Sequence, residues 1–372
     1  MRFTIVSHVP HSVDQNKYYA YAPYIREMNL WIQYVDELII VAPLTNSKIT
    51  AIHEYYKHSN IKFVELKSFD FLSLKSSLVS IPILLGNMHT IYKAFKYTDH
   101  IHLRCPGNIG MLGAMVQVLF PKLNKTTKYA GNWDPMAKQP LSYKFQRMLV
   151  SSTFWSKNMK VLVYGEWPNQ SKNIVPFFTA TYNESEKTPL LPKVLDGKIQ
   201  VLFVGTLAIG KQTLYAIQIA EGLRKMGKKV QLSIYGEGAE RTSLLSYIQQ
   251  QQLEEIVFLK GNVSKETLIE EYKNAHALIL ASKSEGWPKV LAEAMFWGCL
   301  PIATAVSCVP SMLAEEERGI LLSGALEQDV IKINSVFENQ EVYDQKINLA
   351  IHWSRSFTID TFEREIKKLL HS

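Results

Sequence analysis

Short apolar runs alternate with longer segments of helical periodicity along the whole chain. In the first half, runs of strand length occupy residues 3–7, 38–42, 61–66, 100–103, 128–130 and 161–164. In the second half, they occupy residues 201–205, 230–235, 256–260, 277–281 and 301–303. Helical patterning covers residues 19–33, 111–119, 214–225, 240–250, 265–274, 289–297 and 360–370. Because buried parallel strands read as continuous apolar runs, this alternation predicts parallel sheets covered by helices on both faces.

The alternation occurs twice, once on each side of a polar segment that contains two prolines. At 372 residues, the chain is also longer than one ordinary compact domain. We therefore predict an α/β protein with two doubly wound, Rossmann-like domains. The predicted parts are an N-terminal domain over residues 1–182, a linker over 183–198, a C-terminal domain over 199–355 and a C-terminal helix over 356–372. Ligands of such sheets bind at the carboxyl ends of the strands, so we expect the site in an interdomain cleft.

One strand–loop–helix segment, residues 277–298, carries the candidate chemistry. Pro288 stands where a first-turn proline would begin the helix, and Gly298 stands where a glycine would end it. The loop then directs the N–H groups of the helix N-terminus towards the strand ends. Those N–H groups and the helix dipole favour a bound phosphate.

Two acids flank this predicted anion site. Glu285 lies in the loop, and Glu293 lies about 7 Å along the helix axis. Carboxylates accept hydrogen bonds from hydroxyl groups, so an acid on each side of a diphosphate suits the sugar and the ribose of a nucleotide sugar. In the alternative interpretation, one acid stabilises the helix dipole and the other lies on a solvated face.

The segment resembles glycosyltransferase family 4, whose members are retaining enzymes of the GT-B fold. The family pattern, Glu-Gly-(Phe/Trp)-x5-Glu-Ala-x3-Gly and a later proline, is matched by Glu285, Gly286, Trp287, Glu293, Ala294, Gly298 and Pro301. Upstream, residues 204–211 resemble the strand and loop that supply a diphosphate-binding lysine, here Lys211. Residues 235–238 resemble the next strand-end turn, and residues 260–263 resemble the loop that holds the base. The resemblance covers roughly residues 199–325.

The resemblance implies a role for each matched residue. Lys211 and the helix N-terminus would neutralise the leaving diphosphate, Glu285 would orient the sugar, and Glu293 would bind the ribose. The other nucleotide-sugar-binding residues that it implies are Gly205, Thr206, Gly236, Asn262, Val263, Gly286, Trp287, Val290 and Leu291. No cofactor is implied. The sequence has no Asp-x-Asp triplet that could hold a divalent ion, so we expect a metal-independent enzyme. Alternatively, Lys211 is an ordinary surface lysine at a helix start.

The chain departs from the family pattern at several places. Thr206 replaces the arginine that usually accompanies the lysine, and Ser307 and Cys308 replace a glycine pair. The usual histidine near the donor sugar is missing, so Asn132 or Asp134 would have to serve. His8, which follows the first strand in place of a glycine-rich loop, is a candidate residue on the acceptor or sugar side. The same role is open to His11 and His102, although such histidines are more often packed in a core.

The resulting function hypothesis is a retaining glycosyltransferase. It would move a hexosyl group from a nucleotide diphosphate sugar to a glycan or lipid-linked acceptor in bacterial surface polysaccharide synthesis. Residues 18–31 and 129–135 suggest the acceptor domains of capsule and surface-polysaccharide transferases. One alternative is a non-hydrolysing nucleotide-sugar epimerase, which would leave the paired glutamates unexplained. Another is a non-catalytic nucleotide-sugar-binding partner of a second transferase.

The positive charge is concentrated in the first half of the chain. Residues 1–190 contain 21 basic and 12 acidic residues, and residues 104–160 contain nine basic residues and one acid. Residues 141–160 are predicted to form an amphipathic helix with Leu141, Phe145, Met148, Leu149 and Phe154 on its apolar side. We expect a cytoplasmic protein that binds peripherally to the anionic inner face of the plasma membrane and does not bind nucleic acid. Alternatively, the charged face is merely solvated and the apolar residues pack on the sheet.

Overall fold

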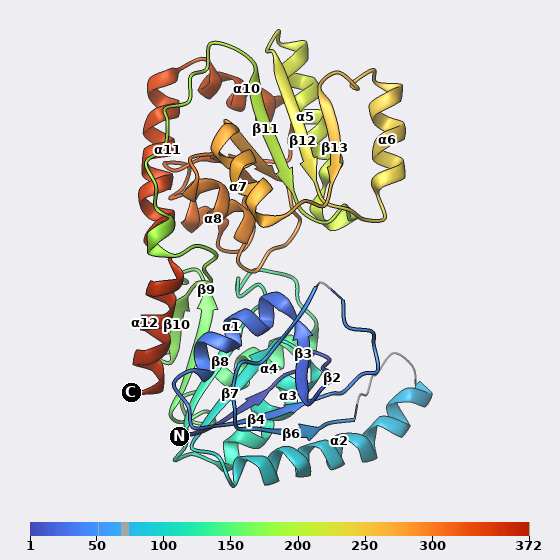
Figure 1. Cartoon of the computed structure of the whole chain (residues 1–372), viewed down its shortest axis with the longest axis vertical. Helices are drawn as coiled ribbons and strands as arrows, with labels where there is room; N and C mark the ends of the chain where they lie inside the picture. Colours follow the sequence, from blue (N-terminus) through green and yellow to red (C-terminus); the bar gives the residue numbers. More distant parts are fainter. Residues whose placement is uncertain (51, 68–73, 372) are drawn as a thin grey trace. The chain divides into compact units, whose positions relative to one another are not determined.

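The computed structural model describes residues 1–50, 52–67 and 74–371, and it divides into two compact units (Figure 1). Unit 1 comprises Met1–Phe177 and Phe362–Ser372, and unit 2 comprises Phe178–Thr361. Each unit is built on its own parallel sheet. Among the described residues, no helix is both long enough and apolar enough to cross a bilayer.

Unit 1 contains, within its described residues, a seven-stranded parallel sheet in the order β10-β9-β8-β7-β1-β4-β6. The strands are β1 (Arg2–Val6), β4 (Glu37–Ala42), β6 (Ile61–Glu65), β7 (His100–Cys105), β8 (Asn124–Tyr129), β9 (Met159–Tyr164) and β10 (Ile174–Phe177). The strand order reverses between β1 and β7. The sheet is therefore doubly wound, with a switch point at the carboxyl ends of those two strands.

The helices of unit 1 are α1 (Ala22–Ile32), α2 (Leu74–Phe95), α3 (Asn108–Val116), α4 (Leu141–Ser151) and the C-terminal helix α12 (Ile359–Leu370), which enters the unit at Phe362. The predicted helix over residues 19–33 begins too early. Residues 17–21 instead form β3 (Lys17–Tyr21), which pairs with β2 (Ser12–Asp14) and β5 (His53–Tyr55) in a small antiparallel sheet. The helix begins only where Pro23 occupies its first turn, as proline's fixed φ favours.

The predicted amphipathic helix over residues 141–160 is also wrong in extent. Helix α4 ends at Ser151, and residues 152–158 form turns before β9. Two serines close the helix, and Ser152 adopts an extended conformation at its C-cap. Phe154 therefore does not lie on the same helix as Leu141.

Unit 2, which is described in full, contains a six-stranded parallel sheet in the order β13-β12-β11-β14-β15-β16. Its strands are β11 (Ile199–Val204), β12 (Val230–Tyr235), β13 (Val257–Gly261), β14 (Ala277–Leu280), β15 (Leu300–Thr304) and β16 (Ile320–Leu322). Its helices are α5 (Thr213–Lys225), α6 (Arg241–Gln250), α7 (Lys265–Asn274), α8 (Lys289–Phe296), α9 (Val309–Met312), α10 (Leu326–Phe337) and α11 (Gln340–Ser354). The prediction of two doubly wound domains is confirmed.

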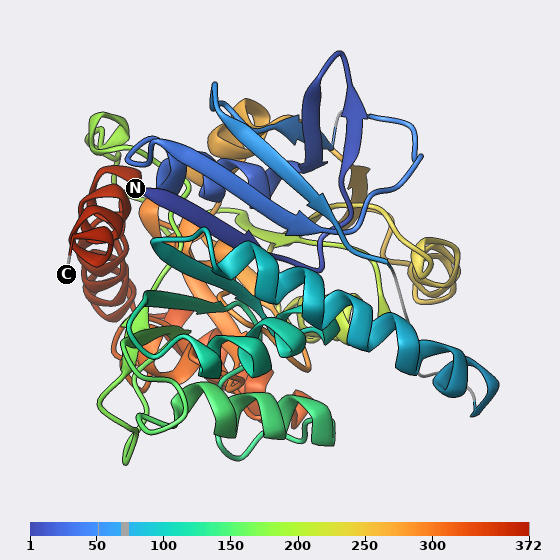
Figure 2. The ribbon, with the colours of Figure 1, turned by 90° about the horizontal axis from the view of Figure 1, so that it is seen from below.

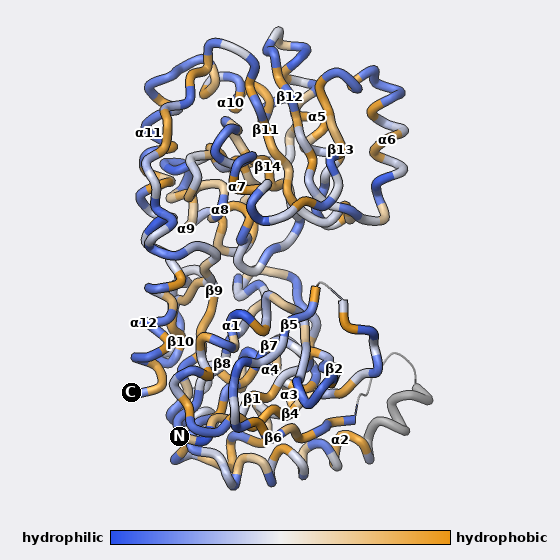
Figure 3. The backbone as a smooth tube through the Cα atoms, in the orientation of Figure 1, coloured by the Kyte–Doolittle hydropathy of each residue, from blue (hydrophilic) through white to orange (hydrophobic). Residues whose placement is uncertain are grey.

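The strands supply the core of each unit, which is why the apolar runs located them. Figure 3 shows hydrophobic residues concentrated along the strands and along the helix faces that cover them. All four residues of β14 are buried, as a central parallel strand requires. In unit 2, the strand order reverses between β11 and β14. The loops that follow β11, β12, β13 and β14 therefore meet at one edge of the sheet.

Candidate active site

Lys211 and Glu285 meet at the switch point of the unit 2 sheet. Lys211 closes a short 3-10 turn after β11, and Glu285 lies in the loop after β14. The Lys211 Nζ lies 2.5 Å from the Glu285 Oε1. The two loops are also joined through the backbone, because the Lys283 N–H donates to the Gly210 carbonyl at 2.8 Å. The fold thus places an ammonium group and a carboxylate in the crevice where doubly wound sheets bind ligands.

Two glycines let the loops after β11 and β12 approach each other. The Gly205 N–H donates to the Tyr235 carbonyl at 2.9 Å. Gly236 has a φ of +138°, and a Cβ atom added to it would lie 1.9 Å from the Gly205 carbonyl oxygen. Position 236 therefore excludes any other residue unless the loop moves.

An open cavity of about 340 Å³ lies beside these loops. Its lining includes five residues that the sequence assigned to nucleotide-sugar binding: Gly205, Thr206, Gly236, Asn262 and Val263. The lining also includes Tyr235, Glu237 and, from α7, Leu268. The volume is in the range of small-molecule sites, and the mixture of apolar walls and a few polar groups is typical of them.

Helix α8 directs its N-terminus towards this edge of the sheet. It begins at Lys289, and Pro288 is its N-cap rather than a first-turn residue, one position from the prediction. Leu291 is fully buried, and its N–H already donates to the Pro288 carbonyl. A phosphate at this helix end would therefore meet the N–H groups that precede Leu291 in the first turn. Gly298 ends the helix as predicted, with a φ of +76°.

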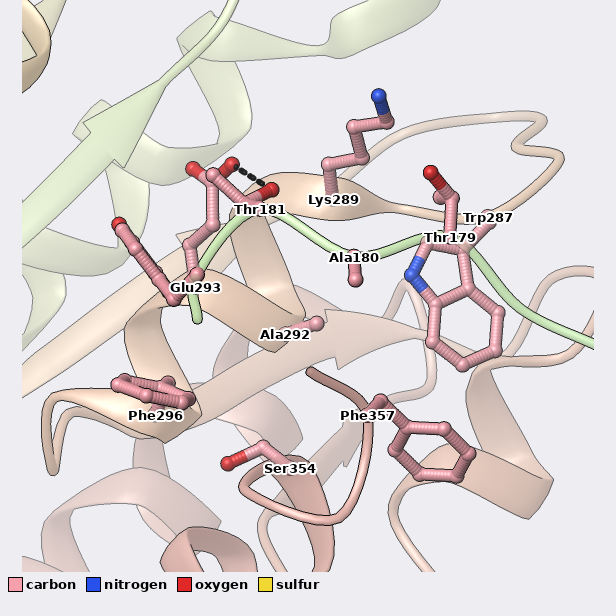
Figure 4. Close-up of a pocket in the computed structure, with 11 residues that line it drawn as sticks. Thr179, Ala180, Thr181, Trp287, Lys289, Ala292, Glu293, Phe296, Ser354 and Phe357 are labelled. Atoms are coloured by element: carbon pink, nitrogen blue, oxygen red, sulfur yellow. Dashed lines mark hydrogen bonds between the residues drawn. The ribbon is translucent and has the colours of Figure 1, made fainter. Parts of the chain in front are cut away.

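Glu293 lies on α8 with both carboxylate oxygens engaged. The Thr181 hydroxyl donates to Oε1 at 2.8 Å, and the Tyr272 hydroxyl donates to Oε2 at 3.3 Å. Burial raises the pKa of the Glu293 carboxyl, and these hydrogen bonds together with the charge of Lys289 oppose that rise. The adjoining cavity has room for about one water molecule, at about 10 Å³ (Figure 4).

Helix α7 borders both the larger cavity and Glu293. Its Tyr272 contacts Glu293, and its Leu268, one helical turn earlier, lines the larger cavity. Residues four apart on a helix lie on the same face about 6 Å apart. Leu268 and the fully buried Tyr272 therefore lie on one face of α7, which borders the larger cavity at Leu268 and contacts Glu293 at Tyr272. No sequence pattern indicates Thr181, Tyr272 or Lys289 as partners of this glutamate.

Gly286 and Trp287 serve the loop rather than the larger cavity. The Trp287 ring packs against Trp353 and Phe357, with centroid distances of 6.0 and 5.7 Å. The Gly286 carbonyl accepts hydrogen bonds from the Ser307 hydroxyl and the Cys308 thiol, both at 3.2 Å. The two residues that replace the family's glycine pair thus hold the Glu285 loop in place.

In unit 1, three predicted site residues lie in loops after the strands. His8 follows β1 at the switch point, and a Cβ atom on Gly107 would lie 2.8 Å from its Nδ1. The Asn132 side chain accepts from the Asp134 N–H, and the Asp134 carboxylate accepts from the Met136 N–H, both at 2.8 Å. Asn132 and Asp134 therefore shape their own loop.

The other two candidate histidines belong to the core. His11 and His102 are fully buried and hydrogen-bond to Tyr56 and Thr126, respectively. Desolvation lowers the pKa of His11 to about 4 and lowers the pKa of His102 well below its ordinary value. For both, the alternative that the histidine packs in a core therefore holds. Of the three histidines, His8 alone lies at the surface of the described part of unit 1.

Comparisons with known proteins relate unit 2 to glycosyltransferases. Residues 192–353 match the family model described as "Glycosyl transferases group 1". An uncharacterized glycosyltransferase of Haemophilus influenzae is 27% identical over 188 residues, which cover 49% of this chain and 52% of the relative. Lipopolysaccharide 1,6-galactosyltransferase of Salmonella typhimurium is 29% identical over 175 residues, which cover 45% of this chain and 48% of the relative. The match thus spans about half the length of each of these curated relatives.

Solved structures resemble the whole chain. The apo lipopolysaccharide outer core galactosyltransferase WaaB has a TM-score of 0.69 at 15% identity, with 100% of this chain and 99% of that chain covered. The Anabaena protein Alr3699/HepE in complex with UDP and glucose has a TM-score of 0.65 at 12% identity and the same coverage. At these identities the likeness establishes the fold alone. The fold is GT-B, and the family match over unit 2 supports a glycosyltransferase.

Proposed function

We propose that the protein is a retaining glycosyltransferase that moves a hexosyl group from a nucleotide diphosphate sugar to a glycan or lipid-linked acceptor in bacterial surface polysaccharide synthesis. The observation that carries the proposal is the Lys211–Glu285 pair at the switch point of unit 2, beside the N-terminus of α8. The similarity to a lipopolysaccharide galactosyltransferase supports the choice of acceptor class.

The geometry suggests where each part of the donor binds. The cavity of about 340 Å³ suits the base, and Glu293, which is contacted from the same face of α7, would accept the ribose hydroxyls. The diphosphate would bind between Lys211 and the N–H groups of α8, where charge and helix dipole favour an anion. Glu285 would then accept a hydroxyl of the transferred sugar.

The chemistry asks mainly for charge stabilisation. When the bond between the sugar and the diphosphate breaks, negative charge develops on the diphosphate, and preorganised donors stabilise it. Lys211 is the cation placed for this task, because Thr206 stands where the family has an arginine. With an ammonium group and helix N–H groups in these positions, we propose that transfer needs no metal ion and no cofactor. The acceptor hydroxyl would attack from the face that the nucleotide leaves, which retains the anomeric configuration.

The proposal is tested by incubating the purified protein with labelled UDP-glucose, UDP-galactose and UDP-N-acetylglucosamine, with and without EDTA. Release of UDP that is resistant to EDTA, and lost in a Glu285→Gln variant, is the expected result. A transferred sugar whose anomeric configuration matches the donor would support retention. Isomerised donor without release would instead identify an epimerase. Binding with neither transfer nor isomerisation would identify a non-catalytic nucleotide-sugar-binding protein.

The proposed place of action is the cytoplasm, with peripheral binding of unit 1 to the inner face of the plasma membrane. A lipid-linked acceptor resides in that membrane, and a cytoplasmic nucleotide sugar must meet it there. The excess of basic over acidic residues in residues 1–190, 21 against 12, supports attraction to an anionic leaflet.

A further inference from the structure

The outer face of α4 exposes large apolar side chains. Leu141, Phe145 and Met148 have spacings of four and three residues, which places them on one side of the helix. They are 83%, 45% and 58% exposed, whereas Leu149 on the other side packs into the core of unit 1. The interpretation that these residues pack on the sheet therefore holds for Leu149 and fails for the other three. Figure 2 shows α4, in green, at the outside of unit 1, next to α3.

The turn after α4 adds two exposed aromatic residues. Phe154 and Trp155 are 69% and 52% exposed, and their rings contact each other edge to face at 5.0 Å. Exposed aromatic rings of this kind favour the boundary between headgroups and acyl chains of a bilayer. The Lys157 ammonium lies 5.9 Å from the centre of the Phe154 ring, so a cation accompanies the pair.

The charge of this segment is uniformly positive. Residues 135–160 contain five basic residues, which are Lys138, Lys144, Arg147, Lys157 and Lys160, and no acidic residue. Lys144 is exposed and lies beside Leu141 and Phe145 on the outer face of α4. An apolar face with flanking cations is complementary to an anionic bilayer and not to a neutral one.

A cationic cavity of about 430 Å³ lies next to the aromatic turn. Thr153, Ser156 and Asn158 of that turn line it, together with three lysines, Lys125, Lys160 and Lys172. None of the described residues that line the cavity is acidic. It is formed at the amino ends of β8 and β9, at the opposite edge of the sheet from the switch point of unit 1.

Lys125 places a buried cation in the wall of this cavity. Its Nζ donates to the Gln117 Oε1 at 3.0 Å and to the Gln117 carbonyl at 3.4 Å, both neutral acceptors. Desolvation lowers the pKa of Lys125 to about 8, and the two neutral acceptors supply no opposite charge. A bound phosphate would supply the missing negative charge.

We propose that the outer face of α4 and the turn at residues 152–158 insert into the headgroup region of an anionic phospholipid bilayer, with a lipid phosphate bound in the cavity of Lys125, Lys160 and Lys172. This proposal specifies the surface for the peripheral membrane contact proposed above, and it is independent of whether unit 2 transfers a sugar.

The test is flotation of the full chain with vesicles of phosphatidylcholine alone or with 30% phosphatidylglycerol. We expect the protein to bind the anionic vesicles and not the vesicles of phosphatidylcholine alone. The double variant Phe154→Ser and Trp155→Ser should weaken it at least tenfold, and its matched control is Ile331→Ser, an equally exposed apolar residue of unit 2. Lys144→Gln and Lys172→Gln should each weaken it about fivefold, with the exposed Lys198→Gln as control. Affinity for UDP, measured in parallel, should stay unchanged in all these variants.

Two results would overturn the proposal. The first is equal flotation, or none, with both vesicle compositions. The second is loss of flotation in the control variants to the same extent as in the variants of α4, the turn and the cavity. Inorganic phosphate and chloride at equal ionic strength separate the cavity from general screening. Stronger displacement of the vesicles by phosphate supports phosphate binding in the cavity, and equal displacement refutes that part.

Discussion

The substitution Glu293→Gln distinguishes the role of Glu293 in ligand binding from its role in folding stability. The substitution keeps the shape of the side chain and removes its charge. In the wild-type protein, the carboxylate is partly buried and its pKa is raised by that burial, so holding it ionised at neutral pH costs free energy. The neutral amide carries no such cost. Its oxygen can still accept from Thr181, and the Tyr272 hydroxyl can rotate to accept from the new NH₂ group.

The expected effects on affinity and stability therefore differ in sign. Hydrogen bonds from ribose hydroxyls to a carboxylate are worth about 1.5–3 kcal/mol, so affinity for the nucleotide should fall by roughly 10- to 150-fold. The free energy of unfolding should stay within about 0.5 kcal/mol of the wild type or rise. Calorimetric titration with UDP and urea unfolding measure the two quantities.

The matched control is Glu270→Gln, an exposed glutamate on α7 that pairs with Lys273. It should change neither quantity, because exposed ion pairs contribute little. UDP affinity of the Glu293→Gln variant within twofold of the wild type would remove Glu293 from the site. A loss of affinity that parallels an equal loss of stability would show that Glu293 acts through the fold.

Three further expectations concern other parts of the molecule. Lys211→Ala should raise the activation free energy of transfer by roughly 2.7–4 kcal/mol, by analogy with a lost oxyanion donor, and so lower turnover. The neighbouring Lys283→Ala should keep normal turnover. Steady-state kinetics measures both variants, and near-normal turnover of Lys211→Ala would refute the role of Lys211. Gly236→Ala should lower the melting temperature and the affinity for UDP together, because the new Cβ meets the Gly205 carbonyl at 1.9 Å; an unchanged melting temperature would contradict this. The pKa of His11 is lowered to about 4, so the unfolded state takes up protons first as the pH falls. Its contribution to stability is complete above pH 6.5 and is lost between pH 6.5 and 4, by about 1.3 kcal/mol from pH 7.5 to 5.5; urea unfolding of His11→Gln should lack that loss.

The sheets could be predicted because their strands are buried on both faces, so that burial alone determines the sequence pattern. Segments that compete with that pattern were harder to assign. Residues 17–21 form a strand because they pair with β2 and β5. Periodicity within a segment cannot reveal partners that lie outside it. The end of α4 was missed for a similar reason. Phe154 fits the helical period, but the backbone turns away at Ser152.

In the candidate site, too, some residues could be predicted from the sequence and others could not. Lys211, Glu285 and the cavity glycines belong to loops that follow strands, and strand order places such loops together. The partners of Glu293 come instead from α7 and from the segment that precedes the linker. A threonine and a tyrosine at distant positions carry no local signal of that role. In the sequence, Ser307 and Cys308 indicate the loss of the family's glycine pair. In the structure, both side chains donate hydrogen bonds to the loop that carries Glu285.

The return of the last helix to unit 1 has a consequence for biosynthesis. Phe362 of α12 packs against Phe177 at 5.2 Å, and the buried Lys128 ammonium lies among Tyr164, Phe177 and Phe362. During translation, the strands of unit 1 emerge before unit 2, but they lack this wall until α12, which follows unit 2 in the chain, has been made. Of the two units, unit 1 is therefore started before unit 2 and finished after it. While unit 2 is being made, the incomplete unit 1 would expose an apolar surface and Lys128, which is buried in the folded unit. A chaperone would protect unit 1 during that interval.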